Sequence, residues 1–275
     1  MKTIIAATDF SSISLNAVNY AAELAVSTNS ELSIVHVCPL PISFSEIAVA
    51  AENIMDCTMT AREHMNDLVG KLHAAKPDLS LSSEIFQGDI IDLLEEYCVK
   101  TRPFLVVVGS ESRTAFERFL SGGGNTLKAV RRFSCPVIVV PPGSQFTRIS
   151  KVGLACDLRE VIDTIPAREI KSMVKQFGAE FHIIYSTRNY KAAVVPEVIE
   201  QSAWLQEMFD ELKPEYHFLQ GEEIGIELDD FSEKHQLDLL IIIPKKHGLA
   251  ASIFHHSRSK DVVLHAHIPI MAIHE

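Results

Sequence analysis

The chain has 275 residues and a formal net charge of −11, with 47% hydrophobic and 22% charged residues. These values are typical of one large or two ordinary globular domains with a full core. The negative charge and the lack of a basic tract disfavour nonspecific binding to nucleic acid or to anionic lipid.

The sequence disfavours both targeting segments and disulfides. Asp9 interrupts the first apolar stretch too early for a secretory signal, and no apolar run approaches membrane-spanning length. The cysteines are odd in number, far apart and without a CxxC pair; they are Cys38, Cys57, Cys98, Cys135 and Cys156. We therefore expect a cytoplasmic protein with reduced core thiols.

Strands and helices alternate through the first half of the chain. Strands are predicted over 2–8, from 31 to the prolines Pro39 and Pro41, over 79–88, over 105–108, and after Cys135-Pro136. Helices are predicted from a cap at Ser11 or Ser12 through Ala25, over 45–75, over 89–101, and from near Asn125. The strand at 2–8 is apolar without alternation, which indicates a parallel sheet covered on both faces. This order predicts a doubly wound α/β fold with right-handed crossovers.

The second half repeats the first. KVGLACDL matches KTIIAATDF and sets Asp157 at the place of Asp9, LDLLIIIP matches PFLVVVG, and IPIMAIHE closes the chain as CPVIVVPP closes the first half. A repeat of this length indicates two copies of one fold. We predict two Rossmann-like domains, 1–146 and 147–275, each with a five-stranded parallel sheet. Pairing of their apolar last strands would protect both edges and form an internal pseudo-dimer.

The stretch between Gly109 and Asn125 is the first candidate for a binding site. It leaves the carboxyl end of a predicted strand and carries three consecutive glycines, Gly122 to Gly124, before a predicted helix. Free backbone amides at a helix start attract anions, and open α/β sheets bind ligands beyond the carboxyl ends of their strands. The stretch is therefore a candidate phosphate site, although the glycines could also serve only a tight turn.

The chain resembles the universal stress protein family, in its tandem form, along essentially its whole length. Three motifs carry the resemblance. They are T-D-F-S at Thr8–Ser11, a second strand ending in His36-Val37, and the segment G-N-T-x-K-x-V-R-x-x-x-C-P-V. The resemblance implies an adenine nucleotide alpha hydrolase-like fold. In the nucleotide-binding branch of that family, a loop G-x2-G-x9-G-[ST] holds the ATP phosphates and ribose. The aspartate after the first strand lies on the adenine side, and the backbone of the H-V pair lines the base.

The resemblance assigns a nucleotide site to the first half. Asp9 matches the aspartate, Val37 the base-lining residue and Gly109 the first glycine of the loop. Ser112 stands in place of the second glycine, and one extra residue precedes Asn125-Thr126, so the loop departs from the pattern. The implied binding residues are Ala7, Thr8, Asp9, Val37, Gly109, Ser112, Gly122, Gly123, Gly124 and Asn125.

The second half departs further from the nucleotide-binding pattern. Pro244-Lys245-Lys246-His247-Gly248 stands where Gly109 stood, and Phe254-His255-His256-Ser257 replaces the glycine cluster. Bulky side chains would occupy the place of a phosphate, and the lysines are typical of a solvated surface. We interpret the second half as a scaffold that has lost its ligand.

The sequence gives less support to other nucleotide-binding loops, to a zinc site or to a catalytic site. The sequence has no G-x-x-x-x-G-K-[ST] loop, and no G-x-G-x-x-G follows the first strand. Nine of the twelve histidines lie in the second half. His265 and His267 alternate along a strand and could bind zinc with a cysteine, but the sequence favours scattered structural histidines. Asp9 and Asp157 have no evident nucleophile or acid partner, so they predict no catalytic site.

These observations predict an adenine-nucleotide-binding protein of the stress response that is not an enzyme, with slow ATP hydrolysis at most. The ligand would be ATP or AMP, and Mg2+ would accompany a triphosphate. A further homodimer is possible, while nucleic acid and membrane are not expected partners. The alternative is a nucleotide-free protein that acts through partner binding, which Ser112 and the altered second half favour. An enzyme acting on nucleotides ranks third.

Overall fold

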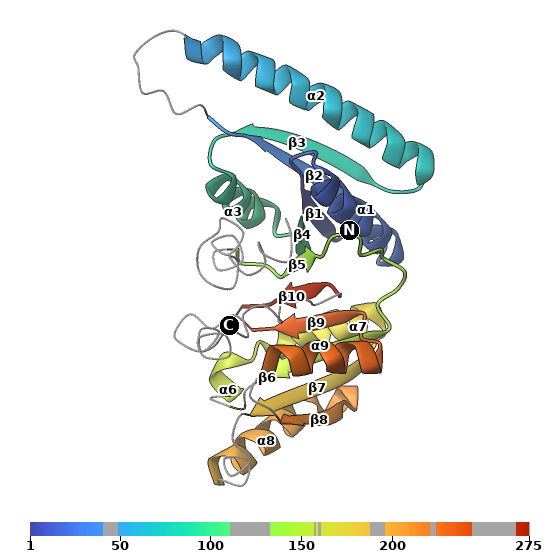
Figure 1. Cartoon of the computed structure of the whole chain (residues 1–275), viewed down its shortest axis with the longest axis vertical. Helices are drawn as coiled ribbons and strands as arrows, with labels where there is room; N and C mark the ends of the chain where they lie inside the picture. The colour runs from blue at the N-terminus through green and yellow to red at the C-terminus, as the bar shows by residue number, and fades with distance from the viewer. Residues whose placement is uncertain are drawn as a thin grey trace.

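The computed structural model describes residues 1–40, 49–110, 133–156, 158, 161–187, 196–220, 224–243 and 268–274. Their strands form one ten-stranded sheet in the order β3-β2-β1-β4-β5-β10-β9-β6-β7-β8. Figure 1 shows β5 and β10 at the middle of the molecule, with the strands of the first half on one side and those of the second on the other. None of the described helices has the length and apolar character needed to cross a membrane.

The first half contains five parallel strands and three described helices. The strands are β1 (Thr3–Ala7), β2 (Glu31–Cys38), β3 (Leu81–Gln87), β4 (Leu105–Gly109) and β5 (Val137–Val140). The helices are α1 (Ser12–Ser27), α2 (Val49–Ala75) and α3 (Ile90–Thr101). The predicted strands and helices of this half agree with the structure wherever its residues are described. The helix predicted near Asn125 lies outside the described residues.

The second half repeats this arrangement. Its strands are β6 (Lys151–Cys156), β7 (Glu180–Thr187), β8 (Glu215–Gln220), β9 (Leu239–Ile242) and β10 (Ile270–Ala272). Its helices are α6 (Val161–Thr164), α7 (Ala167–Phe177), α8 (Pro196–Phe209), the 3-10 turn Asp210–Leu212 and α9 (Ile224–His235). The internal repeat predicted β6, β9 and β10, but no range was predicted for α6, α7, α8 or β8.

The two halves join where β5 and β10 pair in antiparallel register. Val139 pairs with Ile270, and Ala272 pairs with Val137. Every other strand pair of the sheet is parallel. The predicted fold class, a tandem pair of doubly wound α/β units, is confirmed. The domain boundary at residue 146, which falls between β5 and β6, stays a prediction.

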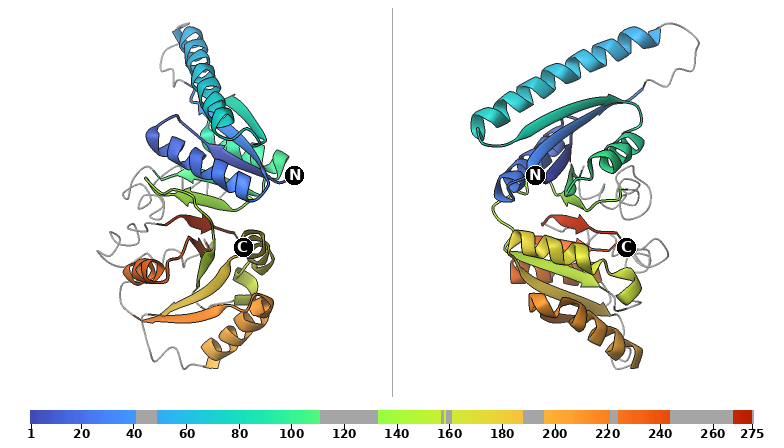
Figure 2. Two further views of the ribbon diagram at one scale, coloured as in Figure 1. Left: turned by 90° about the vertical axis from the view of Figure 1, so that its right-hand side faces the viewer. Right: turned by 180° about the vertical axis from the view of Figure 1, so that it is seen from behind.

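Helices cover both faces of the sheet, and the core divides accordingly. In the left view of Figure 2, α9 lies on one side of the second half's strands, and α7 and α8 lie on the other. Along β5, Ile138 and Val140 belong to the core beneath α1 and α7, whereas Val137 and Val139 belong to the core on the α3 face. This alternation follows from the two-residue period of a strand.

Backbone positions with positive φ recur in the two halves and show how closely the repeat holds. Arg102 (φ 46°) and Gln236 (φ 55°) follow the last residues of α3 and α9, and Asn29 (φ 50°) and Gly178 (φ 61°) each lie two residues before a strand. The left-handed conformation is a common helix end because it lets the chain leave the helix sharply. The repeat therefore preserves turn geometry where residue type differs.

The segment between the halves is tied to the first half. The Asn16 side-chain amide donates to the carbonyl oxygens of Pro141 (3.4 Å) and Ser144 (3.2 Å). The Phe146 ring packs edge-on against Tyr20 at 5.2 Å. These contacts anchor the connection beneath α1, so it is more than a spacer.

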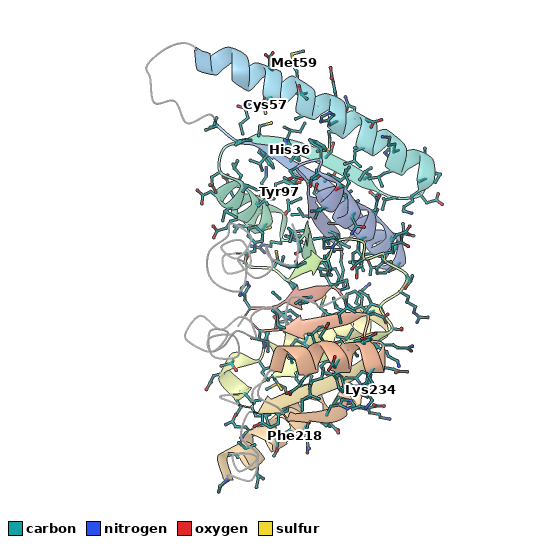
Figure 3. The ribbon with its side chains drawn as sticks, viewed as in Figure 1. His36, Cys57, Met59, Tyr97, Phe218 and Lys234 are labelled. Atoms are coloured by element: carbon teal, nitrogen blue, oxygen red, sulfur yellow. The ribbon has the colours of Figure 1, made fainter. Side chains whose placement is uncertain are left out.

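The structure corrects one expectation about the cysteines. All five cysteines are free, and Cys57 is exposed rather than part of the core. Burial, followed by a hydrogen bond with Cys57, raises the pKa of the Cys38 thiol to about 11, which keeps that thiol protonated. On the same helix Met59 is exposed and Met65 is buried; Figure 3 labels Cys57 and Met59 on α2.

Glycine positions in the sheet give a direct test of the packing. A Cβ at Gly153 in β6 would lie 2.7 Å from Leu237 Cδ1 and 3.0 Å from Ile184 Cδ1. We expect Gly153→Ala to lower the free energy of unfolding by about 1–3 kcal/mol through overpacking. Gly70→Ala is the matched control, because nothing lies within 4 Å of its Cβ.

In a helix interior, alanine at position 70 should stabilise the protein by up to about 1 kcal/mol. Urea unfolding of both variants measures the two effects. A Gly153→Ala protein as stable as wild type would contradict the packing described for β6.

Candidate functional site

The first half brings its predicted site residues to the carboxyl ends of three adjacent strands. β1 lies between β2 and β4, with Ala7 paired to Val35 and Ala6 paired to Val107. The turn after β1 and the ends of β2 and β4 therefore share one edge of the sheet. Open α/β sheets form their binding crevices at this edge.

A network of hydroxyl groups fixes the turn between β1 and α1. The Thr8 hydroxyl is buried and lies 3.0 Å from the Ser14 hydroxyl, and it accepts a hydrogen bond from the Phe10 amide at 2.9 Å. Ser11 caps α1, as one of the two predicted candidates, and its hydroxyl accepts from the Ser14 amide at 3.3 Å. The turn is thus held by side chains before any ligand binds.

Phe10 adopts a left-handed backbone conformation, with φ 63°. This conformation costs a residue with a side chain about 1–2 kcal/mol, so its surroundings must hold it in place. The Phe10 ring packs against His36 at 4.6 Å and against His64 of α2 at 5.2 Å. His36, which Figure 3 labels, donates from Nδ1 to the Thr8 carbonyl oxygen at 2.8 Å and so braces the same turn.

Asp9 is exposed at the tip of this turn. Its Oδ1 accepts the Ser11 amide at 3.0 Å. Burial acts to raise the pKa of the Asp9 carboxyl, but hydrogen bonds with Ser11 and Ser14 outweigh it and hold the pKa below its usual value. The carboxylate is therefore ionised at neutral pH and presents a hydrogen-bond acceptor to solvent.

Gly109 ends β4 beside the start of α1. A Cβ at this position would lie 2.9 Å from the Ile13 carbonyl oxygen and 3.0 Å from Ile13 Cγ2. Glycine is thus required for close helix-to-strand packing, whatever ligand the edge binds. Val37, the predicted base-lining residue, is 8% exposed in β2 and pairs with Phe86.

The structure does not describe most of the predicted phosphate loop. Ser112, Gly122, Gly123, Gly124 and Asn125 lie outside the described residues, as does Asp157 of the second half. The last described residue before the loop, Ser110, donates its amide to the Val140 carbonyl oxygen at 3.0 Å, so the chain is still paired with β5 at that point. The described part of the site therefore comprises Ala7, Thr8, Asp9, Val37 and Gly109.

A groove of about 510 Å³ lies between α1 and α2. Phe10, Leu15 and Glu23 line one side, and His64 and Lys71 belong to the other. Phe10 is the one residue that this groove shares with the T-D-F-S turn. The sequence analysis did not predict the groove, because it depends on the angle at which α2 leaves the sheet.

The two histidines considered for zinc, His265 and His267, lie outside the described residues. Three others, His182, His217 and His235, come together instead, with candidate ligand nitrogens all within 4.8 Å of one another. These three histidines are clustered, not scattered as expected, and their structural role stays a prediction. Their spacing in the sequence gives no signal, because the contacts depend on strand register and on where α9 ends.

Comparison with known proteins identifies the family. Residues 1–141 match the model of the universal stress protein family, which covers more than half of the 275-residue chain. The chain belongs to the universal stress protein family. No curated protein matches the sequence.

Solved structures support the same fold over both halves. A universal stress protein from Archaeoglobus fulgidus DSM 4304 matches with a TM-score of 0.69 at 17% identity, over 100% of this chain and 96% of that chain. A protein of unknown function from Pseudomonas aeruginosa PAO1 matches with a TM-score of 0.58 at 13% identity, over 100% and 92%. At these identities the likeness establishes the fold.

The packing role of Gly109 can be tested without a ligand. Gly109→Ala should lower the free energy of unfolding by about 1–3 kcal/mol, because the new methyl group meets a backbone carbonyl that cannot rotate away. Urea unfolding in nucleotide-free buffer measures the loss, with Gly70→Ala again as the control. Wild-type stability for Gly109→Ala would leave ligand binding as the reason for glycine at this position.

Proposed function

We propose that the protein binds one adenine nucleotide, ATP or AMP, at the carboxyl edge of the first half and acts as a nucleotide-responsive protein of the stress response. The observation that carries the proposal is the braced T-D-F-S turn. It holds an ionised, exposed Asp9 at the same edge of the sheet as Gly109, the glycine that ends β4. The chain keeps this constellation in a family whose nucleotide-binding branch uses the same residues.

The chemistry of adenine suits this edge of the sheet. The exocyclic amino group of adenine donates hydrogen bonds, and the Asp9 carboxylate accepts them. The backbone at Val37 would line the base, and the loop from Gly109 to Asn125 would supply amides to the phosphates. Mg2+ would accompany ATP and neutralise its triphosphate.

We further propose that the site belongs to the domain 1–146 and that the domain 147–275 serves as a scaffold. The strand registers support this division. Thr3 pairs with Glu31 as Lys151 pairs with Glu180, which sets Cys156 at the place of Thr8 and Leu158 at the place of Phe10. Leu158 keeps the positive φ, at 48°, but the hydroxyl that Thr8 contributes is replaced by a thiol.

Binding without rapid turnover follows from the same residues. Asp9 Oδ1 accepts the Ser11 amide and His36 Nδ1 is bonded to the Thr8 carbonyl oxygen, so both side chains brace the turn instead of activating water. We therefore propose a binding protein in the cytoplasm that hydrolyses ATP slowly at most. A further homodimer could add to the pairing within the chain.

One observation favours a different function. Because Ile13 explains glycine at position 109, that residue would be kept in a protein that binds no nucleotide. The second candidate is therefore a nucleotide-free protein that acts by binding a partner, consistent with Ser112 and the altered second half. A single binding measurement distinguishes the two candidate functions.

Isothermal titration with AMP and with Mg-ATP tests the proposal. Wild type should bind one nucleotide per chain. Gly122→Glu should abolish binding, because a carboxylate would repel the phosphates. Asp9→Asn should weaken binding about tenfold through loss of a charged hydrogen bond.

Asp157→Asn is the matched control, since it changes the corresponding aspartate of the second half and should leave affinity unchanged. Circular dichroism would establish that all three variants fold. If wild type gives no heat of binding, or if Gly122→Glu binds with equal affinity, nucleotide binding at this site is ruled out. The protein would then be the nucleotide-free, partner-binding candidate.

A further inference from the structure

Three histidines from different elements of the second half converge on the face of the sheet that α9 covers. His182 is the third residue of β7, His217 the third of β8, and His235 the last of α9. Their candidate ligand nitrogens all lie within 4.8 Å of one another. Figure 3 labels Lys234, the neighbour of His235, at the end of α9.

Strand register explains why the three meet. His182 pairs with Glu215 and Ile184 pairs with His217, so both histidines follow the same alternation as Ile184. Ile184 belongs to the core on the α9 face, together with Phe231. Phe231 stacks on His235 at 4.0 Å and contacts His217 edge-on at 4.7 Å, which fixes both rings.

The cluster leaves a buried polar atom without a partner. His182 is 3% exposed, and its Nδ1 lies 3.0 Å from His217 Nε2. Its Nε2 is buried and has no hydrogen-bond partner. Buried polar atoms are nearly always satisfied, so the protein leaves this ring with less hydrogen bonding than is usual in a core.

The first half shows that the fold does not need imidazoles here. The registers set Ser33 at the place of His182, Glu84 at the place of His217, and Thr101 at the place of His235. Ser33 lies 3.1 Å from the Tyr97 hydroxyl of α3, which satisfies both groups. The equivalent residue of α9 is Phe231, which has no hydrogen bond to offer. The second half has therefore exchanged a satisfied polar pair for a histidine cluster.

We propose that His182, His217 and His235 bind one zinc ion, with the carboxylate of Glu215 as the fourth ligand. Zinc prefers imidazole nitrogen and carboxylate oxygen in tetrahedral geometry, with bonds of about 2.0–2.1 Å and hence ligand nitrogens about 3.3 Å apart. His182 Nδ1 and His217 Nε2, which are 3.0 Å apart, are already near that separation. Glu215 Oε2 lies 3.6 Å from His182 Nδ1 and 3.8 Å from His217 Nε2, and this side chain is 69% exposed and can rotate inward.

The charge state of the rings suits metal binding. Burial, as the largest influence, lowers the pKa of His182 and of His217, so both rings are neutral at neutral pH. Zinc binds the neutral imidazole. Lys151 is a nearby cation, whose Nζ donates to the His235 carbonyl oxygen at 3.3 Å; at His182, Glu215 and Glu180 act on the pKa in the opposite direction to Lys151.

The proposed site is structural rather than catalytic, because four protein ligands leave no open position on the metal. It lies at the amino ends of β7 and β8, at the opposite ends of these strands from the edge where the fold binds nucleotides. Zinc there would tie the last turn of α9 to two strands, one of them at the edge of the sheet. The second half would thus have a ligand of its own, independent of nucleotide.

Zinc titration of the full chain, stripped with a chelator and dialysed, tests the proposal by competition with a coloured zinc indicator. Wild type should bind one zinc per chain at this site, and zinc should raise the thermal unfolding temperature. Cobalt(II) in its place should give the visible absorption of a tetrahedral site. Elemental analysis of protein purified without chelator provides the stoichiometry.

Two variants with accessible side chains separate binding from folding. His235→Asn should remove the site, and Glu215→Gln should weaken zinc binding by at least about tenfold. His73→Asn, an exposed histidine on α2, is the control and should bind as wild type. No zinc binding by wild type, or wild-type affinity in the folded His235→Asn protein, would overturn the proposal and leave the histidines as core residues.

Discussion

The antiparallel pairing of β5 with β10 is the interaction on which the rest of the structure depends. Each strand is short and wholly apolar, and each would be an exposed edge in an isolated half. Their three paired residues turn two five-stranded sheets into one and let the core run across the junction. Ile138 and Met271, which are paired, lie in the same fully buried cluster.

This junction explains how the two halves can diverge in chemistry without losing the fold. The backbone of the repeat is kept down to its left-handed positions, since Phe10 and Leu158 share a positive φ at the same place in the register. The side chains around those turns differ. Thr8 joins a hydroxyl network in the first half, whereas Cys156 stands at its place in the second. Ser33 and His182 mark a second such difference on the other side of the sheet.

Much of the fold could be predicted from the sequence. Apolar strands, helical spacing and the long internal repeat predicted the order of elements, and Ser11 was one of two caps expected for α1. Cys57 was misjudged as a core residue, because apolar character alone does not tell which face of α2 meets the sheet. The bracing of Phe10 by His36 depends on contacts between distant segments, which no local pattern encodes.

The candidate site was predictable only in part. The T-D-F-S turn and Gly109 were found from their resemblance to the family, but the packing need for Gly109 comes from Ile13, which the motif does not include. The histidine cluster was missed altogether, because His182, His217 and His235 are separated by 35 and 18 residues in the sequence and meet only through strand register.

Native mass spectrometry of the purified chain tests the central claim, that one half keeps a nucleotide site and the other has lost it. Sprayed with an excess of AMP, the chain should gain the mass of a single nucleotide, and this species should saturate. Two nucleotides per chain would show that the second half still binds, and none would show that the first half does not.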